Sequence, residues 1–300
     1  MKILAVVVTF NRKDLLMRCL DHLKIQTIIP DKILVINNDS TDGTEDVLIN
    51  NNIDYITQEN TGSAGGWHTG ISYALANNFD ACWLMDDDGF PDSKALKILS
   101  SRLSADTACA SSVVLRENER EYFVFPFPVL NNNNFPILGG IKRRFFSLNE
   151  IDAVLDNNQY PFAHLFNGAL LNMSLVAKVG NINKDYFIMG DEVDFFYRLR
   201  EEGEVITCFE SKHFHPDVSS RPYSPEKIYY LIKNTIIINY LYLDNKFLRS
   251  ILNVPVVLFR TAKRNGWKFL FSIIIGSRKK FLYQAIVQGF RGSLGNDLNK

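Results

Sequence analysis

The stretch Ile-Leu-Ala-Val-Val-Val-Thr-Phe at Ile3–Phe10 decides the predicted fold class. It is a continuous apolar run, rich in β-branched residues and of strand length, which is typical of a strand buried on both faces. Similar runs follow at Ile33–Ile36, Ile53–Thr57 and Ala81–Met85, with helical patterns between them. Strands that alternate with helices in this way predict right-handed β-α-β units and a parallel sheet.

Helix signals lie between these strands and again near the C-terminus. Leucines at helical spacing mark Asp14–Gln26, and a second helix should begin near Thr44, where acidic residues occupy the first turn. At Ser224 a serine N-cap is followed by a proline, a pattern typical of a helix start. This last helix should run to about Leu243.

The composition is that of a globular protein with unevenly distributed charge. Of its 300 residues, 46% are hydrophobic and 22% are charged, which excludes disordered and collagen-like chains. Lys+Arg and Asp+Glu both number 33, yet the residues from Lys246 onward include eleven basic and one acidic side chain. The first 245 residues therefore carry a charge of about −10 and the remainder about +10, which predicts different partners for the two ends.

Cysteine spacing and hydropathy indicate a cytoplasmic protein. No CxxC pair occurs, so neither a zinc ribbon nor a redox pair is expected, and a reducing compartment is the simplest interpretation. No signal peptide is recognised, and no apolar run reaches the ~18–20 residues that span a bilayer. The four cysteines are Cys19, Cys82, Cys109 and Cys208.

We predict a catalytic domain over residues 1–223 and a basic helical region over residues 224–300. Within the catalytic domain, the stretch Arg116–Asn158 holds several prolines and an asparagine tract, which predicts loops with short strands. The basic region is either an ordinary helical subdomain or a peripheral surface for anionic lipid, where each basic residue contributes ~1 kcal/mol. Nucleic-acid binding is not expected, because no recognised module accompanies the basic residues.

Polar residues follow every predicted strand of the sheet. They are Thr9–Arg12, Asn37–Asp42, Gln58–Asn60 and Asp86–Asp88. In parallel sheets, ligands bind beyond the carboxyl ends of the strands. The convergence of these four polar segments therefore predicts a binding site at that edge of the sheet.

Three consecutive aspartates predict a cation site. In an extended segment, Asp86 and Asp88 would face one side together while Asp87 points away. Hard divalent ions such as Mg²⁺ bind carboxylate oxygens and share their remaining positions with phosphate. The alternative is a solvated acidic turn.

The glycine-rich run Asn60-Thr-Gly-Ser-Ala-Gly-Gly-Trp-His68 precedes a helix expected at Thr69–Asn77. Gly65 and Gly66 would allow a backbone to approach an anion, and the helix N-terminus would offer N–H groups. The run matches neither a dinucleotide fingerprint nor a P-loop, so it does not predict either ligand. A loop with a tight turn would have the same pattern.

Further acids and histidines lie later in the chain. Asp191 and Glu192 open a predicted helix, where they either complement the helix dipole or act as a general base. His213 and His215 share one face of an alternating stretch, and such a histidine can give a neutral ring nitrogen to a metal.

Over roughly residues 1–220 this ordered set of motifs resembles family 2 glycosyltransferases with the GT-A fold. The matching segments are VVVTFNR, NNDSTDGT, ENTGSAGGWHTGI, LMDDDGFPD, FNGALL and GDEVDFFYR. The resemblance implies a Rossmann-like, mostly parallel nucleotide-sugar-binding sheet flanked by helices, with a C-terminal helical extension. The NTGSAGG form and the triple aspartate look most like the galactofuranosyltransferase and rhamnosyltransferase branches, which build bacterial surface polysaccharides.

The resemblance also implies roles for matching residues. Asp86, Asp88 and His215 would hold Mn²⁺ or Mg²⁺, and Asp191 or Glu192 would be the catalytic base. Asn37 stands where the family usually has an aspartate that contacts the base of the nucleotide. The residues expected to bind the donor nucleotide are Thr9, Phe10, Asn11, Arg12, Asn37, Asn60, Gly65, Gly66, Asp86 and Asp87.

The implied reaction is metal-dependent, inverting transfer of a hexose from a nucleotide-sugar. UDP-galactofuranose or another UDP-hexose is the favoured donor, and the acceptor is a growing surface polysaccharide that a lipid could carry at the inner face of the plasma membrane. Alternatives are a dTDP-rhamnose-dependent rhamnosyltransferase and a non-catalytic nucleotide-sugar-binding protein. A sugar nucleotidyltransferase should have a glycine-rich basic loop after the first strand, and VVVTFNRKDLL has no glycine.

Overall fold

The computed structural model describes residues 1–140 and 142–297, and the chain divides into two compact units. The first unit comprises Met1–Ile182 and Phe195–Asp217, and the second comprises Asn183–Asp194 and Val218–Lys300. The sequence predicts a single boundary at residue 224. It does not separate Asn183–Asp194, the short segment that carries the predicted catalytic carboxylates.

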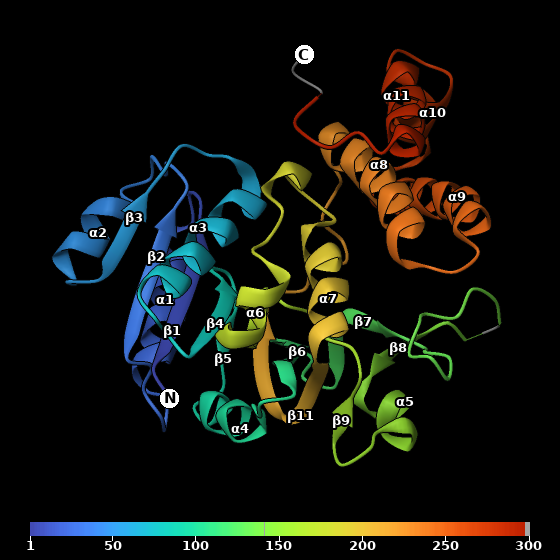
Figure 1. Ribbon diagram of the computed structural model, residues 1–300. Coiled ribbons are helices and arrows are strands. Elements are labelled where there is room, and N and C mark those ends of the chain that lie inside the picture. The colour runs from blue at the N-terminus through green and yellow to red at the C-terminus, as the bar shows by residue number, and fades with distance from the viewer. Residues whose placement is uncertain (141, 298–300) are drawn as a thin grey trace. The chain divides into compact units, whose positions relative to one another are not determined.

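A mixed sheet forms the centre of the first unit (Figure 1). Its strands lie in the order β3 (Asp54–Thr57), β2 (Lys32–Asn37), β1 (Ile3–Thr9), β4 (Ala81–Asp86), β10 (Asn167–Asn172), β6 (Thr107–Arg116), β11 (Glu204–His215) and β5 (Phe90–Pro91). β3, β2, β1, β4, β6 and β11 run in one direction, whereas β10 and β5 run in the other. The predicted α/β class with a mostly parallel sheet is therefore confirmed, and the antiparallel β10 is an addition.

Helices and three short strands complete this unit. The strands are β7 (Tyr122–Pro128), β8 (Arg144–Ser147) and β9 (Gln159–Tyr160). The segment Arg116–Asn158, predicted as loops with short strands, contains β7 and β8 and also two short helices at Leu148–Ile151 and Asp152–Val154. The helices are α1 (Lys13–Lys24), α2 (Thr44–Asn50), α3 (Gly62–Ala76), α4 (Ala95–Arg102), α5 (Leu148–Ile151), η1 (Asp152–Val154) and α6 (Met173–Val179). The helix α7 (Asp191–Glu202) begins in the second unit and continues in the first.

The two faces of β1 pack against different helices. Side chains alternate along a strand, so Ile3, Ala5 and Val7 share one face, where they form a core with residues of α1 and α4. Val6 and Val8 lie on the opposite face against α3. All five are buried, which explains why this segment is apolar without alternation.

The glycine-rich run is helical, which corrects the expectation of a loop before residue 69. α3 begins at Gly62 and therefore contains both Gly65 and Gly66. A Cβ atom at Gly66 would lie 2.6 Å from Cγ1 of Val8, and one at Gly70 would lie 2.4 Å from Cγ1 of Val6. These glycines let the helix approach the strand closely, a long-range requirement that local sequence does not reveal.

The second unit is helical after its first segment. Its elements are η2 (Lys184–Tyr186), α8 (Pro225–Tyr242), α9 (Lys246–Asn265), α10 (Trp267–Ile274) and α11 (Lys279–Arg291). The hydroxyl of Ser224 accepts a hydrogen bond from the backbone N–H of Lys227 at 3.1 Å, so the predicted helix start is confirmed. No helix within residues 1–140 and 142–297 is long and apolar enough to cross a bilayer.

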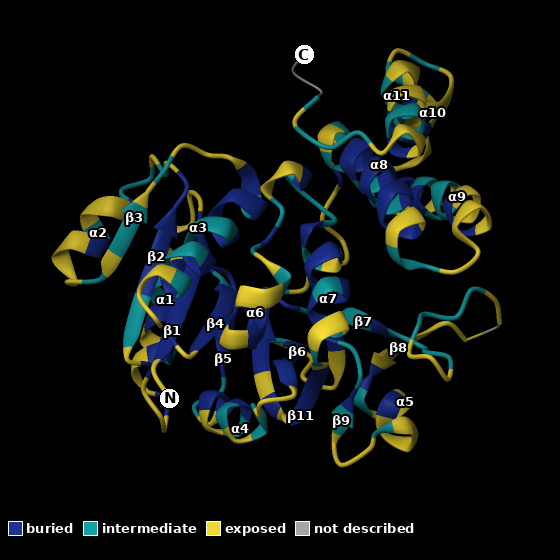
Figure 2. Cartoon of the chain, viewed as in Figure 1, coloured by how far each residue is buried: buried dark blue, intermediate teal, exposed yellow. Residues whose placement is uncertain are grey.

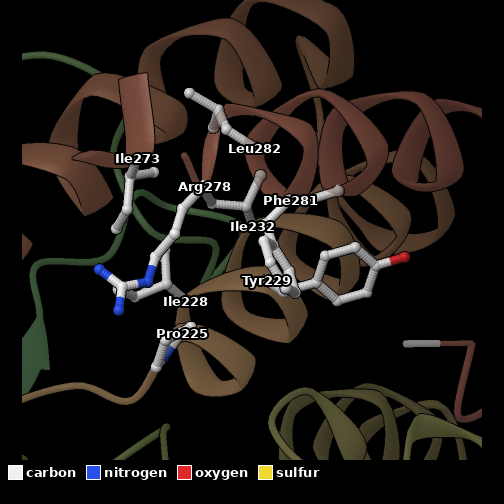
Figure 3. A pocket seen from close by; sticks show the side chains of 9 residues that line it. Pro225, Ile228, Tyr229, Ile232, Ile273, Arg278, Phe281 and Leu282 are labelled. Atoms are coloured by element: carbon white, nitrogen blue, oxygen red, sulfur yellow. The ribbon is translucent and has the colours of Figure 1, made fainter. Parts of the chain in front are cut away.

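α8 is the core helix of this unit and is largely buried (Figure 2). Beside it, a small apolar hollow is lined by side chains of α8, α10 and α11 (Figure 3). The buried ammonium of Lys233 donates to the carbonyl oxygen of Gly295 at 3.0 Å and pairs with Asp297 Oδ1 at 2.8 Å. The tyrosines Tyr229 and Tyr230 bind the same C-terminal segment through Asp297 and Asn296. These contacts hold the C-terminal segment on α8.

Candidate active site

An arginine connects two buried carboxylates beyond the ends of β1 and β4. Nη1 of Arg12 lies 3.0 Å from Asp87 Oδ1 and 2.9 Å from Asp88 Oδ2. The hydroxyl of Thr9 donates to Asp87 Oδ2 at 2.7 Å. Because β1 and β4 are parallel neighbours, their carboxyl ends bring these four residues together.

The aspartates adopt a turn, which differs from the predicted extended arrangement. β4 ends at Asp86, and Asp87 and Asp88 form a turn in which both carboxylates reach the guanidinium of Arg12. Asp87 therefore does not point away from Asp88. Burial raises the pKa of Asp87, and the charge of Arg12 and the Thr9 hydroxyl act in the opposite direction. The sequence-based prediction assigned the charge compensation of the aspartates to a metal ion and overlooked that Arg12 provides positive charge beside Asp87 and Asp88.

His215 faces Asp88. Its Nε2 lies 2.8 Å from Asp88 Oδ1, and its Nδ1 lies 2.7 Å from the carbonyl oxygen of Pro216. The carbonyl oxygen can only accept, so Nδ1 carries the hydrogen and Nε2 is the ring nitrogen that faces Asp88. An imidazole nitrogen and a carboxylate oxygen are both atoms that bind divalent ions, so the pair fits such an ion.

The structure brings together two of the three predicted metal ligands. Asp88 and His215 are paired, while Asp86 lies at the end of β4 and is half-buried. Among the residues described, no group of three or more histidine, cysteine or acidic side chains is arranged to hold a metal. An ion at Asp88 and His215 would take its further oxygen ligands from another molecule, as Mg²⁺ does with substrate phosphates.

The neighbouring His213 has a packing role. It is fully buried between two glycines, since a Cβ atom at Gly89 would lie 2.3 Å from its Nε2 and one at Gly168 would lie 3.1 Å from its Nδ1. Burial lowers the pKa of His213 to about 3, so its ring is neutral. Of the two histidines, only His215 contacts Asp88.

Asparagines shape the loops after β1 and β2. The side chain of Asn11 accepts from the backbone N–H of Thr41 at 2.7 Å, and its own backbone N–H donates to Ser40 Oγ at 2.9 Å. Asn37 is fully buried, donates to Thr57 Oγ1 at 3.3 Å and accepts from the backbone N–H of Ser40 at 3.0 Å. Asn37 thus holds the loop, and its contact with a nucleotide base stays a prediction.

Other predicted donor-binding residues differ in exposure. Phe10 is 45% exposed at the end of β1, which suits a side chain that would contact a ligand. Asn60 accepts from the backbone N–H of Gly62 at 3.0 Å and so binds the first residue of α3. Gly65 and Gly66 lie inside that helix.

Two of the predicted polar strand ends are connected by hydrogen bonds that were not predicted. Gln58 donates to Asn38 Oδ1 at 2.9 Å and accepts from the Thr69 hydroxyl at 2.6 Å. Asn38 is 3% exposed, so its amide is an interior group that needs partners. Its place next to Asn37 at the end of a buried strand was the available signal.

The predicted carboxylates begin α7, in the second unit. Asp191 is 3% exposed, and its Oδ2 has no hydrogen-bond partner among the described residues. Burial raises the pKa of Asp191 to about 7, and the charge of Glu192 acts in the same direction. Glu192 is half-buried. A carboxylate with a pKa near 7 suits proton transfer at neutral pH.

The loop before Asp191 has an unusual backbone. Phe187 has φ +62° and ψ −69°, and the N–H of Ile188 donates to the carbonyl oxygen of Tyr186 at 2.8 Å, which forms a rare γ-turn. Met189 and Gly190 also have positive φ, at 60° and 107°. In the non-glycine residues Phe187 and Met189, such conformations cost about 1–3 kcal/mol each and persist where surrounding contacts fix them.

Solved structures define the fold class of this protein. With 12% sequence identity and a TM-score of 0.62, TarS from S. aureus covers 97% of this chain, which spans 49% of that longer chain. A mannosyltransferase from Pyrobaculum calidifontis, solved with GDP-Man and Mn²⁺, has 14% identity, a TM-score of 0.57 and coverage of 96% and 87%. The protein thus has the GT-A glycosyltransferase fold.

Sequence comparison identifies the family. The model of glycosyl transferase family 2 matches residues 4–161. Galactofuranosyltransferase GlfT1 from Mycobacterium tuberculosis is 34% identical over 228 residues, covering 71% of this chain and 70% of GlfT1. GlfT1 from Mycolicibacterium smegmatis is 32% identical over 220 residues, with the same coverage. The chain belongs to glycosyl transferase family 2 and is a glycosyltransferase.

Proposed function

We propose that this enzyme transfers galactofuranose from UDP-galactofuranose to a growing bacterial surface polysaccharide, with inversion at the anomeric carbon. The supporting observation is the cluster of Arg12, Asp87, Asp88 and His215 at the carboxyl ends of the strands. The likeness to galactofuranosyltransferase GlfT1 favours this sugar, and the TarS structures solved with UDP and UDP-GlcNAc favour a uridine nucleotide.

The donor would bind through residues of the first unit. Phe10 would contact the base, and Asn11 would hold the loop around it. The guanidinium of Arg12 would exchange part of its contact with Asp87 and Asp88 for the diphosphate, since guanidinium groups bind phosphate and carboxylate alike. The carboxylate of Asp87 would then keep the Thr9 hydroxyl as its partner.

Asp88 and His215 would hold Mn²⁺ or Mg²⁺, with Asp86 as a further candidate ligand. When bound, such an ion neutralises charge that develops on the leaving diphosphate. The hydrogen bond between His215 Nδ1 and Pro216 orients the imidazole so that Nε2 faces Asp88.

The carboxylate pair of the second unit would supply the base. As the acceptor hydroxyl attacks the anomeric carbon, its proton passes to a carboxylate oxygen of Asp191 or Glu192, and the bond to the diphosphate breaks. Asp191 combines an oxygen that has no partner among the described residues with a raised pKa, whereas Glu192 is the more accessible of the two. The acceptor would be a saccharide, free or carried on lipid at the inner face of the plasma membrane.

The experiment is a screen of UDP-, dTDP- and GDP-sugars for Mn²⁺-dependent breakdown or transfer, read by mass spectrometry. The proposal expects turnover of UDP-galactofuranose, lost with Asp88→Asn and with substitution of one member of the carboxylate pair. Turnover of dTDP-rhamnose alone would identify a rhamnosyltransferase. Binding of donors without any turnover would identify a non-catalytic binding protein and overturn the proposal.

A further inference from the structure

Five large apolar side chains of α9 are exposed. Their exposed fractions lie between 42% and 64%, and at 100° per residue they fall on one face of the helix. They are Phe247, Leu248, Ile251, Leu252 and Phe259. The buried residues of the same helix are Arg249, Ser250, Val257, Thr261 and Ala262, so α9 also packs an apolar side on the core. An ordinary surface helix has charged and polar residues on its outer side, where α9 exposes large apolar residues.

α10 and an aromatic cluster extend this apolar surface. Trp267, Phe271 and Ile275 recur every four residues along and just after α10 and are 60%, 55% and 71% exposed. Phe290 of α11 lies 6.2 Å from Phe247 and 5.8 Å from Tyr240, measured between ring centroids, and all three rings are exposed. Figure 2 shows exposed residues along both α9 and α10. Such a concentration of exposed apolar groups indicates an interaction surface.

Basic side chains adjoin the apolar residues. Arg260 directly follows Phe259, and Lys268 directly follows Trp267. Both Lys263 and Lys268 are exposed. The only acid after residue 246 is Asp297, which pairs with the buried Lys233 of α8. The surface is therefore apolar and positively charged, without neighbouring acids on these helices.

We propose that this face of α9 and α10, the interfacial face, binds the surface of an anionic lipid bilayer. Helices that lie in the plane of a membrane bury an apolar side in the headgroup region and place lysine and arginine beside it. Basic residues near an anionic surface add electrostatic attraction to the burial of the apolar side. A second copy of this chain fits the face poorly, because it would bring two positively charged surfaces together.

The proposal is independent of the donor sugar, although it rests on the proposed function for its biological purpose, access to a lipid-carried acceptor. It also places Trp267 at the lipid. Trp67 and Trp83 are fully buried, whereas Trp267 is 60% exposed, so the response of tryptophan fluorescence to added quencher reports mainly on Trp267.

The experiment uses the full chain with vesicles of phosphatidylcholine, alone or with about 30% phosphatidylglycerol. Flotation measures binding, and quenching by brominated lipid measures insertion of Trp267. The test variant is Phe259→Ser with Trp267→Ser. The matched control is Ile25→Ser with Ile29→Ser, because these isoleucines of the first unit are 61% and 64% exposed. Melting temperatures verify that both variants fold.

We expect wild type and control to float with anionic vesicles, and brominated lipid to quench Trp267 in both. The test variant should bind at least about tenfold more weakly, since it loses two interfacial aromatic anchors. Absence of flotation by the wild type at low salt would overturn the proposal. So would unchanged binding by the test variant, or a dimer in light scattering whose formation protects Trp267 from acrylamide without lipid. Donor breakdown in lipid-free buffer tests the proposed function separately, because the test variant should retain it.

Discussion

The side-chain nitrogen of Asn234 lies 2.5 Å from the carbonyl oxygen of Met189, two residues before Asp191. The same amide lies 3.1 Å from the carbonyl oxygen of Ile188 and 3.2 Å from that of Tyr186. Asn234 is 1% exposed, so these contacts form away from water, where an unpaired carbonyl is costly. One side chain of α8 therefore fixes the γ-turn loop that leads to the carboxylate pair.

Replacing Asn234 by alanine should impair transfer more than donor binding. The substitution removes the amide that the carbonyls of Ile188 and Met189 accept from, which costs about 1–3 kcal/mol of folding stability, and releases the loop before Asp191. We expect kcat for sugar transfer to fall at least about tenfold, as happens when a positioned catalytic group moves, while UDP affinity measured by calorimetry stays within twofold.

Asn239→Ala is the matched control on the same helix. Asn239 is equally buried, but its amide donates to Ser250 Oγ at 3.3 Å and does not contact the loop. It should lower the melting temperature without changing kcat per folded molecule. Equal effects of the two substitutions on kcat would show that Asn234 acts only on stability.

Asp191 should make the stability of the protein depend on pH. The carboxyl has an ordinary pKa of 3.8 in the unfolded chain and about 7 in the folded one, because burial disfavours its charge. Between these values the folded state holds a proton that the unfolded state has released. The contribution of Asp191 to stability is therefore complete below pH 3.8 and is lost as the pH rises towards 7.

Asp191→Asn should remove this loss. We expect the variant to melt several degrees above the wild type at pH 8 and to differ less from it at pH 5. A stability change of 1 kcal/mol shifts the melting temperature by ~4–8 °C in a small domain and by less in a larger one. Asp185→Asn is the control, at an exposed position of the same unit. Its melting temperature should change with pH in parallel with that of the wild type. A constant offset between Asp191→Asn and wild type from pH 5 to 8 would contradict the raised pKa.

Gly70→Ala should destabilise the first unit through overpacking. The added Cβ would lie 2.4 Å from Cγ1 of Val6 in the buried strand β1, and such clashes cost about 1–3 kcal/mol. Gly139→Ala is the control, since its Cβ would meet no atom within 4 Å. Val6→Ala removes the Cγ1 atom of the clash, so combining it with Gly70→Ala should restore part of the lost free energy of unfolding, measured with urea. Strictly additive losses would argue against this contact.

The sequence predicted β1, β2 and β4 well because both faces of each are covered. A strand of this kind is apolar almost throughout and needs no knowledge of its neighbours, so β1, β2 and β4 were found within one residue. The partly exposed edge strand β3 was found as closely. The polar ends of these strands likewise predicted where Thr9, Arg12 and Asp88 gather. Parallel topology alone implies that meeting point.

Features that depend on distant partners could not be predicted. The sequence around Gly66 and Gly70 is consistent with a loop or an ordinary helix. Only their contacts with Val6 and Val8 show why both positions are glycine. The turn at Asp87 depends on a guanidinium that is 75 residues away in the chain.

The same reason applies to the second unit. The contacts of Asn234 join segments 45 to 48 residues apart. For α9, the spacing of apolar residues predicts a stripe but does not say whether it faces the core or the surroundings.

The most direct test is calorimetric titration of UDP into the protein with Mn²⁺ and, separately, with EDTA, for the wild type, Asp88→Asn and the exposed control Asp21→Asn. If Asp88 and His215 hold a cation that binds the diphosphate, wild type and control should bind UDP at least about tenfold more tightly with Mn²⁺. Asp88→Asn should lose that difference while keeping its melting temperature within a few degrees. Equal UDP affinity in Mn²⁺ and EDTA, or an Asp88→Asn variant that keeps the full Mn²⁺ effect, would contradict the account.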